Sequence, residues 1–206
     1  MSEVRVRKRY GGEWLDIREF VRPQTLMVRD LARSLPQDLA AVWGWVVRNV
    51  RYPLGSDDIL DLHQEGRYLT DSGDWLMQDE TDEFWEYPSE VLRDRVADCE
   101  GTSALLVSLG RHFMGPEEIY CTVGTWNGFG HVWVSVPRQW GWEVLETTLD
   151  FLPRVRPVEE QEPYRPILRF NDETAAWVRP GALPDRVRDP EKRRLITGAW
   201  MSQEAS

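Results

Sequence analysis

The stretch that decides the fold is residues 96–110, VADCEGTSALLVSLG, which holds one of only two cysteines in the chain. Its second half is an apolar run closed by glycine, a pattern typical of a buried helix. Asp98 suits the N-cap of that helix, which places Cys99 in the first turn. The amide groups and dipole at a helix start favour negative charge, so we expect a nucleophilic thiolate at Cys99. A small buried residue that fills space is the plainer alternative.

A thiolate nucleophile needs a proton acceptor, and the chain has three histidines. His112 stands thirteen residues along the same helix, and at ~1.5 Å of rise per residue it lies too far from Cys99. His63 falls in an acidic segment, and its spacing leaves it open as a partner. His131 opens a strand after a glycine-rich turn, in GFGHVWVSV, which leaves its ring room to face a neighbour. We therefore expect His131 to be the base.

A third group should orient the imidazole of that base. The strand that His131 opens is followed by a short turn and a second strand, WEVLETT. A hairpin centred on residues 138–139 would place His131 opposite Glu146, and directly opposed residues lie ~5 Å apart. Glu143 would fall on the wrong face. Glu146 is therefore the predicted acid, with a surface polar pair as the alternative.

Aromatic and polar side chains are candidates for a substrate groove. Residues 54–88 are too long for an ordinary connection, so we expect an excursion with short helices that forms a wall or lid. An acyl-enzyme reaction needs donors for the oxyanion. One is the Cys99 N–H, and the other is expected from this excursion. The candidates are Gln64, Trp75, Gln78, Trp85 and Tyr87. Trp126 and Trp133 are expected to wall the groove around His131. Plain aromatic packing is the alternative for all the aromatic candidates.

The periodicity predicts an α+β fold with N-terminal helices packed on an antiparallel sheet. Helices are expected over 34–52, capped by Ser34, and from Ser89 onward, with Gly115 ending the helix that carries Cys99. Strands are expected over 118–126, 131–136, 142–150 and 164–170, with a short helix near 171–177. The expected domains are an N-terminal extension (1–33), a core with the excursion (34–152) and a C-terminal extension packed on the core (153–206).

Composition narrows the classes of function. A net charge of −10 and a pI near 4.9 disfavour nucleic-acid binding. No apolar run approaches the ~18 residues of a membrane helix, and no signal peptide is evident, so we expect a cytoplasmic protein. The cysteines and histidines show no zinc spacing and the acidic stretches no EF-hand pattern, so we expect no metal and no cofactor. Residues 53–100 are rich in acidic side chains. We expect them to form a solvated face or, as the alternative, an acidic rim that recognises a basic partner.

The order of a helix-start cysteine, a strand-opening histidine and an acid on the next strand resembles the transglutaminase-like superfamily of papain-type cysteine enzymes. The resemblance covers about residues 38–150 and implies Cys99 as nucleophile, His131 as base and Glu146 as the orienting acid. The segments that carry it are VLRDRVADCEGTSALLVSLGRHFMG, GHVWVSV and WGWEVLETT, and AVWGWVVRNVRYP resembles the helix that precedes this core.

The resemblance implies an enzyme that forms a thioester with an amide carbonyl of a protein or peptide. Hydrolysis, as in a peptidase or amidase, is favoured over transfer to an amine, because water needs no dedicated second site. The alternative is a non-catalytic binding or assembly module of the same fold. Two departures motivate it: Asp98 stands where the family commonly has glycine, and Glu146 where it commonly has aspartate. The oligomeric state is left open.

Overall fold

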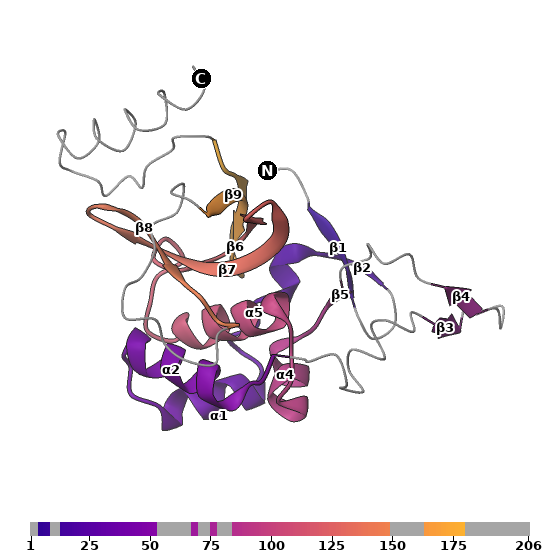
Figure 1. The fold of residues 1–206 in the computed structure, drawn as a ribbon. Coiled ribbons are helices and arrows are strands. Elements are labelled where there is room, and N and C mark those ends of the chain that lie inside the picture. The colour runs from indigo at the N-terminus through magenta and orange to yellow at the C-terminus, as the bar shows by residue number, and fades with distance from the viewer. Residues whose placement is uncertain are drawn as a thin grey trace, which may run out of the picture.

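The computed structural model describes residues 4–8, 13–52, 67–69, 75–77, 84–148 and 163–179 (Figure 1). Its helical part precedes most of its sheet in the chain, which confirms the α+β class. The helices are η1 (Ile17–Phe20, a 3-10 helix), α1 (Leu26–Ser34), α2 (Leu39–Asn49), α4 (Pro88–Asp94) and α5 (Cys99–Gly110).

The main sheet is antiparallel, with the strand order β10-β9-β6-β7-β8. Its strands are β6 (Tyr120–Trp126), β7 (Phe129–Arg138), β8 (Gly141–Leu145), β9 (Tyr164–Phe170) and β10 (Ala175–Trp177). A smaller sheet has the order β2-β1-β5, in which β1 and β5 run parallel. The remaining strands are β1 (Arg5–Lys8), β2 (Trp14–Asp16), β5 (Phe84–Trp85) and the pair β3 (Arg67–Leu69) and β4 (Trp75–Met77).

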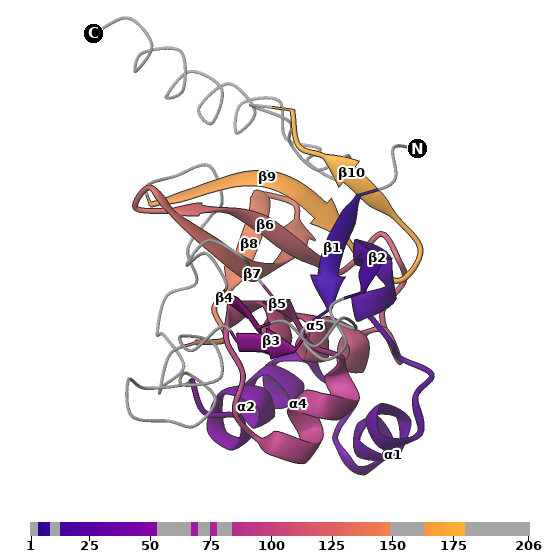
Figure 2. The ribbon, with the colours of Figure 1, turned by 90° about the vertical axis from the view of Figure 1, so that its right-hand side faces the viewer.

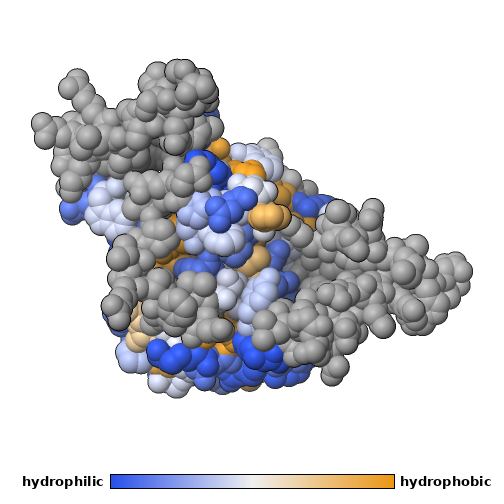
Figure 3. Space-filling view, in the orientation of Figure 1, coloured by the Kyte–Doolittle hydropathy of each residue, from blue (hydrophilic) through white to orange (hydrophobic). Residues whose placement is uncertain are grey.

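Helix α5 lies between the main sheet and the other helices (Figures 1 and 2). It contacts β7 on one side and α1, α2 and α4 on the other. Every residue of α5 is buried, as expected for a helix that is apolar nearly all round. The outer helices keep a polar face, and hydrophilic residues cover the lower edge of the view in Figure 3, where α1 and α2 lie.

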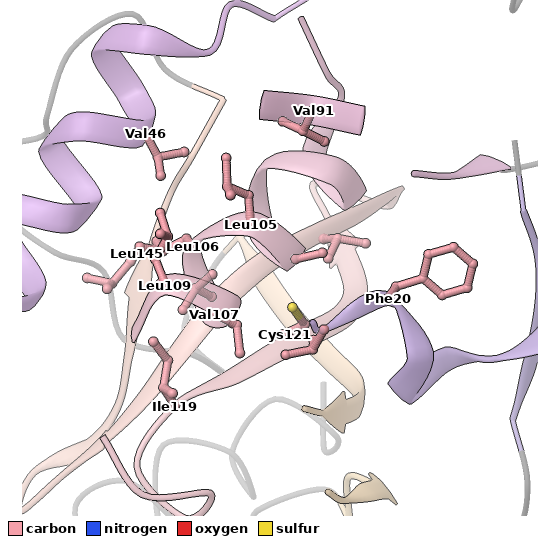
Figure 4. Close-up of a cluster of buried hydrophobic side chains, with 14 of the residues drawn as sticks. Phe20, Val46, Val91, Leu105, Leu106, Val107, Leu109, Ile119, Cys121 and Leu145 are labelled. Atoms are coloured by element: carbon pink, nitrogen blue, oxygen red, sulfur yellow. The ribbon is translucent and has the colours of Figure 1, made fainter. Parts of the chain in front are cut away.

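The core joins α5 to both layers (Figure 4). Leu105, Leu106 and Leu109 are fully buried among side chains from the outer helices and the sheet. Cys121, on β6, is fully buried in the same cluster and forms no disulfide. Cys121 thus fills space in the core.

Two predicted helix starts are wrong. Helix α2 begins at Leu39, where the Asp38 carboxylate accepts the Ala41 N–H at 2.8 Å. Ser34 is instead the last residue of α1, and its hydroxyl bonds the Leu31 carbonyl. A carboxylate three residues before an orphan amide is a strong cap, and it wins over the earlier serine.

Helix α4 starts one residue before the predicted cap Ser89. Tyr87 is its N-cap, and Pro88 occupies the first helical position, where its missing N–H costs nothing. The Glu90 carboxylate accepts the Tyr87 N–H at 2.7 Å. At the other end of the helical region, α5 ends at Gly110, before the predicted Gly115.

The short helix predicted near 171–177 is also wrong. The Asn171 side-chain oxygen accepts the N–H groups of Glu173 and Thr174 at 3.0 and 2.9 Å. This local turn competes with a helix, and it reverses the chain so that β10 pairs with β9. The strand predicted over 164–170 is confirmed as β9.

Gly124 marks a close approach of β6 to its neighbours, and an alanine there should destabilise the protein. A Cβ atom on Gly124 would meet the Arg165 carbonyl oxygen and, at 2.5 Å, a ring carbon of Trp133. We expect Gly124→Ala to lower the free energy of unfolding by ~3 kcal/mol because the sheet would have to move apart. Urea unfolding followed by fluorescence measures it. The Gly128→Ala variant is a contrasting control, since its positive φ strains the turn but its Cβ would meet nothing within 4 Å.

Candidate active site

Cys99 is the first residue of α5, with Asp98 at the N-cap. The Asp98 carboxylate accepts the Gly101 N–H at 3.2 Å. The Cys99 thiol donates to Glu100 Oε2 at 2.9 Å, and both side chains are buried. The thiol therefore sits in the predicted first turn, but it faces a carboxylate of its own helix.

The thiolate predicted at Cys99 is not the favoured form at rest. Burial raises the pKa of Cys99 well above its usual value, and the negative charges of Glu100 and Asp98 and the hydrogen bond to Glu100 raise it further. A hydrogen bond from the Val132 backbone acts in the opposite direction and lowers the pKa. The helix start is as predicted, but the expectation of a thiolate left out burial and the neighbouring carboxylates.

His131, on β7, hydrogen-bonds Glu146 through Nε2 and Oε2 at 2.9 Å. The predicted register of the hairpin is wrong, however. Arg138 pairs with Gly141, so the turn lies one residue later than expected, and each position on β7 faces a residue two places further along. A shift of two keeps the same face of the strand. Glu146 is therefore a diagonal neighbour of His131 rather than its direct partner, and the two side chains still meet.

The carboxylate of Glu146 is held by several donors. Its Oε1 accepts the Thr147 N–H at 2.9 Å, and the Thr148 N–H and hydroxyl at 3.1 and 2.9 Å. Its Oε2 accepts the Tyr164 hydroxyl at 3.1 Å in addition to His131. Burial by itself raises the pKa of Glu146. The hydrogen bond and the charge of His131, together with the hydrogen bonds from Thr148, outweigh this effect and lower the pKa. The group is thus ionised at neutral pH.

The backbone that carries Glu146 is tied to two helices. The Trp43 indole N–H of α2 donates to the Glu146 carbonyl at 2.7 Å. The Thr147 hydroxyl bonds that of Thr102, in the first turns of α5, at 2.8 Å. These supporting residues were not predicted, because no sequence spacing relates α2 or α5 to the end of β8.

Packing of α5 on β7 brings Cys99 and His131 to adjoining elements. The Ser103 hydroxyl donates to the Val132 carbonyl at 3.3 Å, and the Val132 backbone also hydrogen-bonds the Cys99 sulfur. Cys99 therefore lies against the residue that follows His131. The structure gathers a thiol, an imidazole and an ionised carboxylate in one region.

The two tryptophans predicted to wall the groove have different environments. Trp126 is 42% exposed, with its ring centroid 6.3 Å from that of His131. Trp133 is fully buried, 6.0 Å from His131 and edge-on to Tyr164. Trp126 can thus contact a bound molecule, whereas Trp133 supports His131 from inside.

The other predicted groove residues pack elsewhere. Trp85 is 1% exposed, and its ring contacts Phe20 and Phe170 in the core. The Tyr87 ring contacts Phe20, and the Arg22 guanidinium lies 3.5 Å from its centroid. For these two residues the aromatic-packing alternative matches the structure. The side chains of His63, Gln64, Trp75 and Gln78 lie outside the described residues.

A pocket of about 360 Å³ adjoins the loop after Glu146. Tyr52 lines it, although the sequence did not single out this residue. The sequence signal that could have indicated Tyr52 was its position at the end of AVWGWVVRNVRYP, the segment that resembles the helix before the core. The lining residues are Val47, Arg48, Asn49, Val50, Arg51, Tyr52, Thr147 and Thr148.

Metal and membrane features were searched within the described ranges. No group of three or more His, Cys, Asp or Glu residues in them is placed to hold a metal ion. None of the helices in those ranges is long and apolar enough to cross a membrane.

Removing the carboxylate beside the thiol should increase its reactivity. We expect Glu100→Gln to raise the rate of Cys99 alkylation by iodoacetamide severalfold at pH 7, because loss of the negative charge lowers the thiol pKa. The inflection of the rate against pH should move to lower pH. Peptide mass spectrometry measures it, with Asp30→Asn on the exposed face of α1 as a control. An unchanged profile would contradict this role of Glu100.

Comparison with solved structures finds similarity to LapG of Legionella pneumophila. The calcium-bound form has a TM-score of 0.42 and 14% identity over 84% of this chain and 97% of that chain. The EGTA-treated form has a TM-score of 0.44 and 15% identity over 87% and 98%. Both the identities and the TM-scores are low. No family model matches the chain, and no curated protein matches it in sequence.

Proposed function

We propose that this protein is a transglutaminase-like cysteine enzyme that acts on amide bonds through Cys99, His131 and Glu146. The observation that carries the proposal is the hydrogen-bonded His131–Glu146 pair, held beside a cysteine at a helix start. Such a set of nucleophile, base and orienting acid is the arrangement that acyl transfer requires.

The roles follow from the hydrogen bonds. His131 Nε2 faces the ionised carboxylate of Glu146, so in the neutral ring this nitrogen carries the proton and Nδ1 holds the lone pair. The Nδ1 atom accepts the Cys99 proton as sulfur attacks the carbonyl carbon. The proton then passes to the amide nitrogen, the C–N bond breaks and an amine leaves. Water attacks the resulting thioester, with His131 as base, and releases a carboxylic acid and the thiol.

The raised pKa of Cys99 defines the type of mechanism. A thiol that is protonated at rest must lose its proton within the reaction, so His131 acts as a general base rather than as half of a resting ion pair. The proposed substrate is a protein or peptide, and water is the proposed acyl acceptor. The exposed rings of Trp126 and Phe129, close to His131 in sequence, offer apolar contact for such a chain.

A substrate screen tests this proposal. Wild-type protein is incubated with unfolded casein and a dansylated primary amine, and the products are analysed by mass spectrometry. New peptide termini mean peptidase activity, glutamine converted to glutamate means amidase activity, and dansyl incorporation means transfer. We expect one of the first two. Dansyl incorporation alone would overturn the hydrolytic assignment, and none of the three would count against activity on proteins.

A non-catalytic binding module is the second candidate, and the protonated, buried thiol favours it. Here the pair His131–Glu146 would be structural. A partner protein captured equally by wild type and by Cys99→Ala, together with an inert Cys99 thiol, would support the module over the enzyme.

A further inference from the structure

We infer that the Tyr52 hydroxyl, with the Cys99 backbone N–H, donates to the oxyanion that forms when Cys99 attacks a carbonyl group. This inference deepens the proposed function and rests on it. The sequence analysis expected the side-chain donor within residues 54–88. Tyr52 instead follows α2, 47 positions before Cys99.

The backbone fixes Tyr52 beside the start of α5. The Arg51 N–H donates to the Arg95 carbonyl at 2.9 Å, and the Ala97 N–H donates to the Arg51 carbonyl at 3.1 Å. Arg51 and Val96 form a parallel bridge in this way. Tyr52 is the next residue along the chain, so it runs alongside the residues that lead directly into Asp98 and Cys99.

The pocket of about 360 Å³ lies next to this tyrosine. Tyr52, Thr147 and Thr148 share its lining. Both threonines donate N–H groups to Glu146, and Thr147 bonds Thr102 of α5. The pocket is thus bounded by the chain of Tyr52 and by the loop that orients His131. The described lining contains no carboxylate side chain.

The Tyr52 hydroxyl has the protonation state that a donor needs. Burial raises the pKa of Tyr52 to about 12, and the negative charges of Asp98, Glu100 and Glu146 act in the same direction. The phenol therefore keeps its proton at physiological pH and can donate a hydrogen bond. Tyr52 is 41% exposed, so a bound molecule can reach it.

The Cys99 amide is the matching second donor. The first N–H groups of a helix have no partner within the helix. The Asp98 cap takes the Gly101 N–H and leaves the Cys99 N–H available for the oxyanion. Donors of this kind contribute ~10²–10³-fold to acyl transfer when one is removed.

Two probes of the same sulfur separate this role from a structural one. In p-nitrophenyl acetate the sulfur adds to the carbonyl carbon as its proton passes to His131, and the C=O electron pair moves to oxygen. The oxyanion then collapses: the C–O bond to the aryl group breaks, p-nitrophenolate leaves, and an S-acetyl group stays on Cys99. In iodoacetamide the S–C bond forms as the C–I bond breaks and iodide leaves, so no oxyanion forms. Only the first reaction needs Tyr52.

We expect Tyr52→Phe to slow acetylation of Cys99 by about 10²-fold and to leave its alkylation unchanged at the same pH. Tyr52→Gln, which keeps a donor, should recover part of the rate. Tyr120→Phe is the matched control, since Tyr120 packs against Trp142 on the sheet, and neither reaction should change. Mass spectrometry of the Cys99 peptide measures both reactions.

The possible outcomes are distinct. Equal acetylation in wild type and Tyr52→Phe would overturn the inference while leaving the proposed enzyme intact. A parallel loss of acetylation and alkylation would also overturn it, because Tyr52 would then act on the thiol or the fold. A wild-type Cys99 that is alkylated but never acetylated would overturn the proposed function, and the inference with it.

Discussion

Cys99→Ala is expected to abolish amide turnover and all acyl-enzyme formation while the fold is kept. The reason is that the proposed reaction proceeds through a bond to the Cys99 sulfur. The neighbouring hydroxyls of Thr102 and Ser103 are buried and hydrogen-bonded, so they offer no substitute nucleophile. Alanine is well suited to the first turn of a helix, and only the thiol group is lost from the site.

The measurement is intact mass after incubation with p-nitrophenyl acetate, together with thermal unfolding of both proteins. The matched control is Cys121→Ala, which removes the other cysteine from the core and should retain acylation. Acylation of the Cys99→Ala protein at the wild-type rate would disprove Cys99 as the nucleophile. Loss of acylation together with loss of the thermal transition would instead show a folding defect, and Cys99→Ser would then be used.

The second large effect is expected for the base. We expect His131→Ala to lower the acylation rate of Cys99 at pH 7 by ~10³-fold, within the range that general base catalysis contributes. The thiol is protonated at rest, so without the imidazole the reaction loses the base that is proposed to take this proton. The loss should be smaller above the thiol pKa, where the thiolate forms without help.

Added imidazole provides a further test, because it should partly restore the rate in His131→Ala and have no effect on wild type. A purely structural histidine would show no such rescue. The control is His112→Ala, since the His112 ring bonds the Pro23 carbonyl at 2.8 Å beyond the other end of α5. Equal rates in wild type and His131→Ala would remove His131 from the mechanism.

Much of the site could be predicted because it depends on local chemistry. The apolar run after Asp98 predicts a buried helix with Cys99 in its first turn, and the described α5 has this form. The contact between His131 and Glu146 depends on the alternation of faces along a strand. This alternation has a period of two, so an error of two in the register left the contact in place.

Other local features were predicted incorrectly, because several nearby polar groups can form the same hydrogen bond. The starts of α2 and α4 were misplaced because several polar residues compete for each cap. The turn at Asn171 was taken for a helix because its side-chain hydrogen bonds to the backbone are not visible in the periodicity. In each case the competing groups lie within a few residues, and geometry alone chooses between them.

The sequence by itself determined the buried helix that starts at Cys99, the hairpin that carries His131, and the acid that follows its second strand. The tertiary structure alone decided the state of the thiol and the position of Tyr52. The reason is that a pKa depends on burial and on every nearby charge, and both are set by packing. Tyr52 reaches the start of α5 through a bridge between segments far apart in the chain, which only the folded protein brings together.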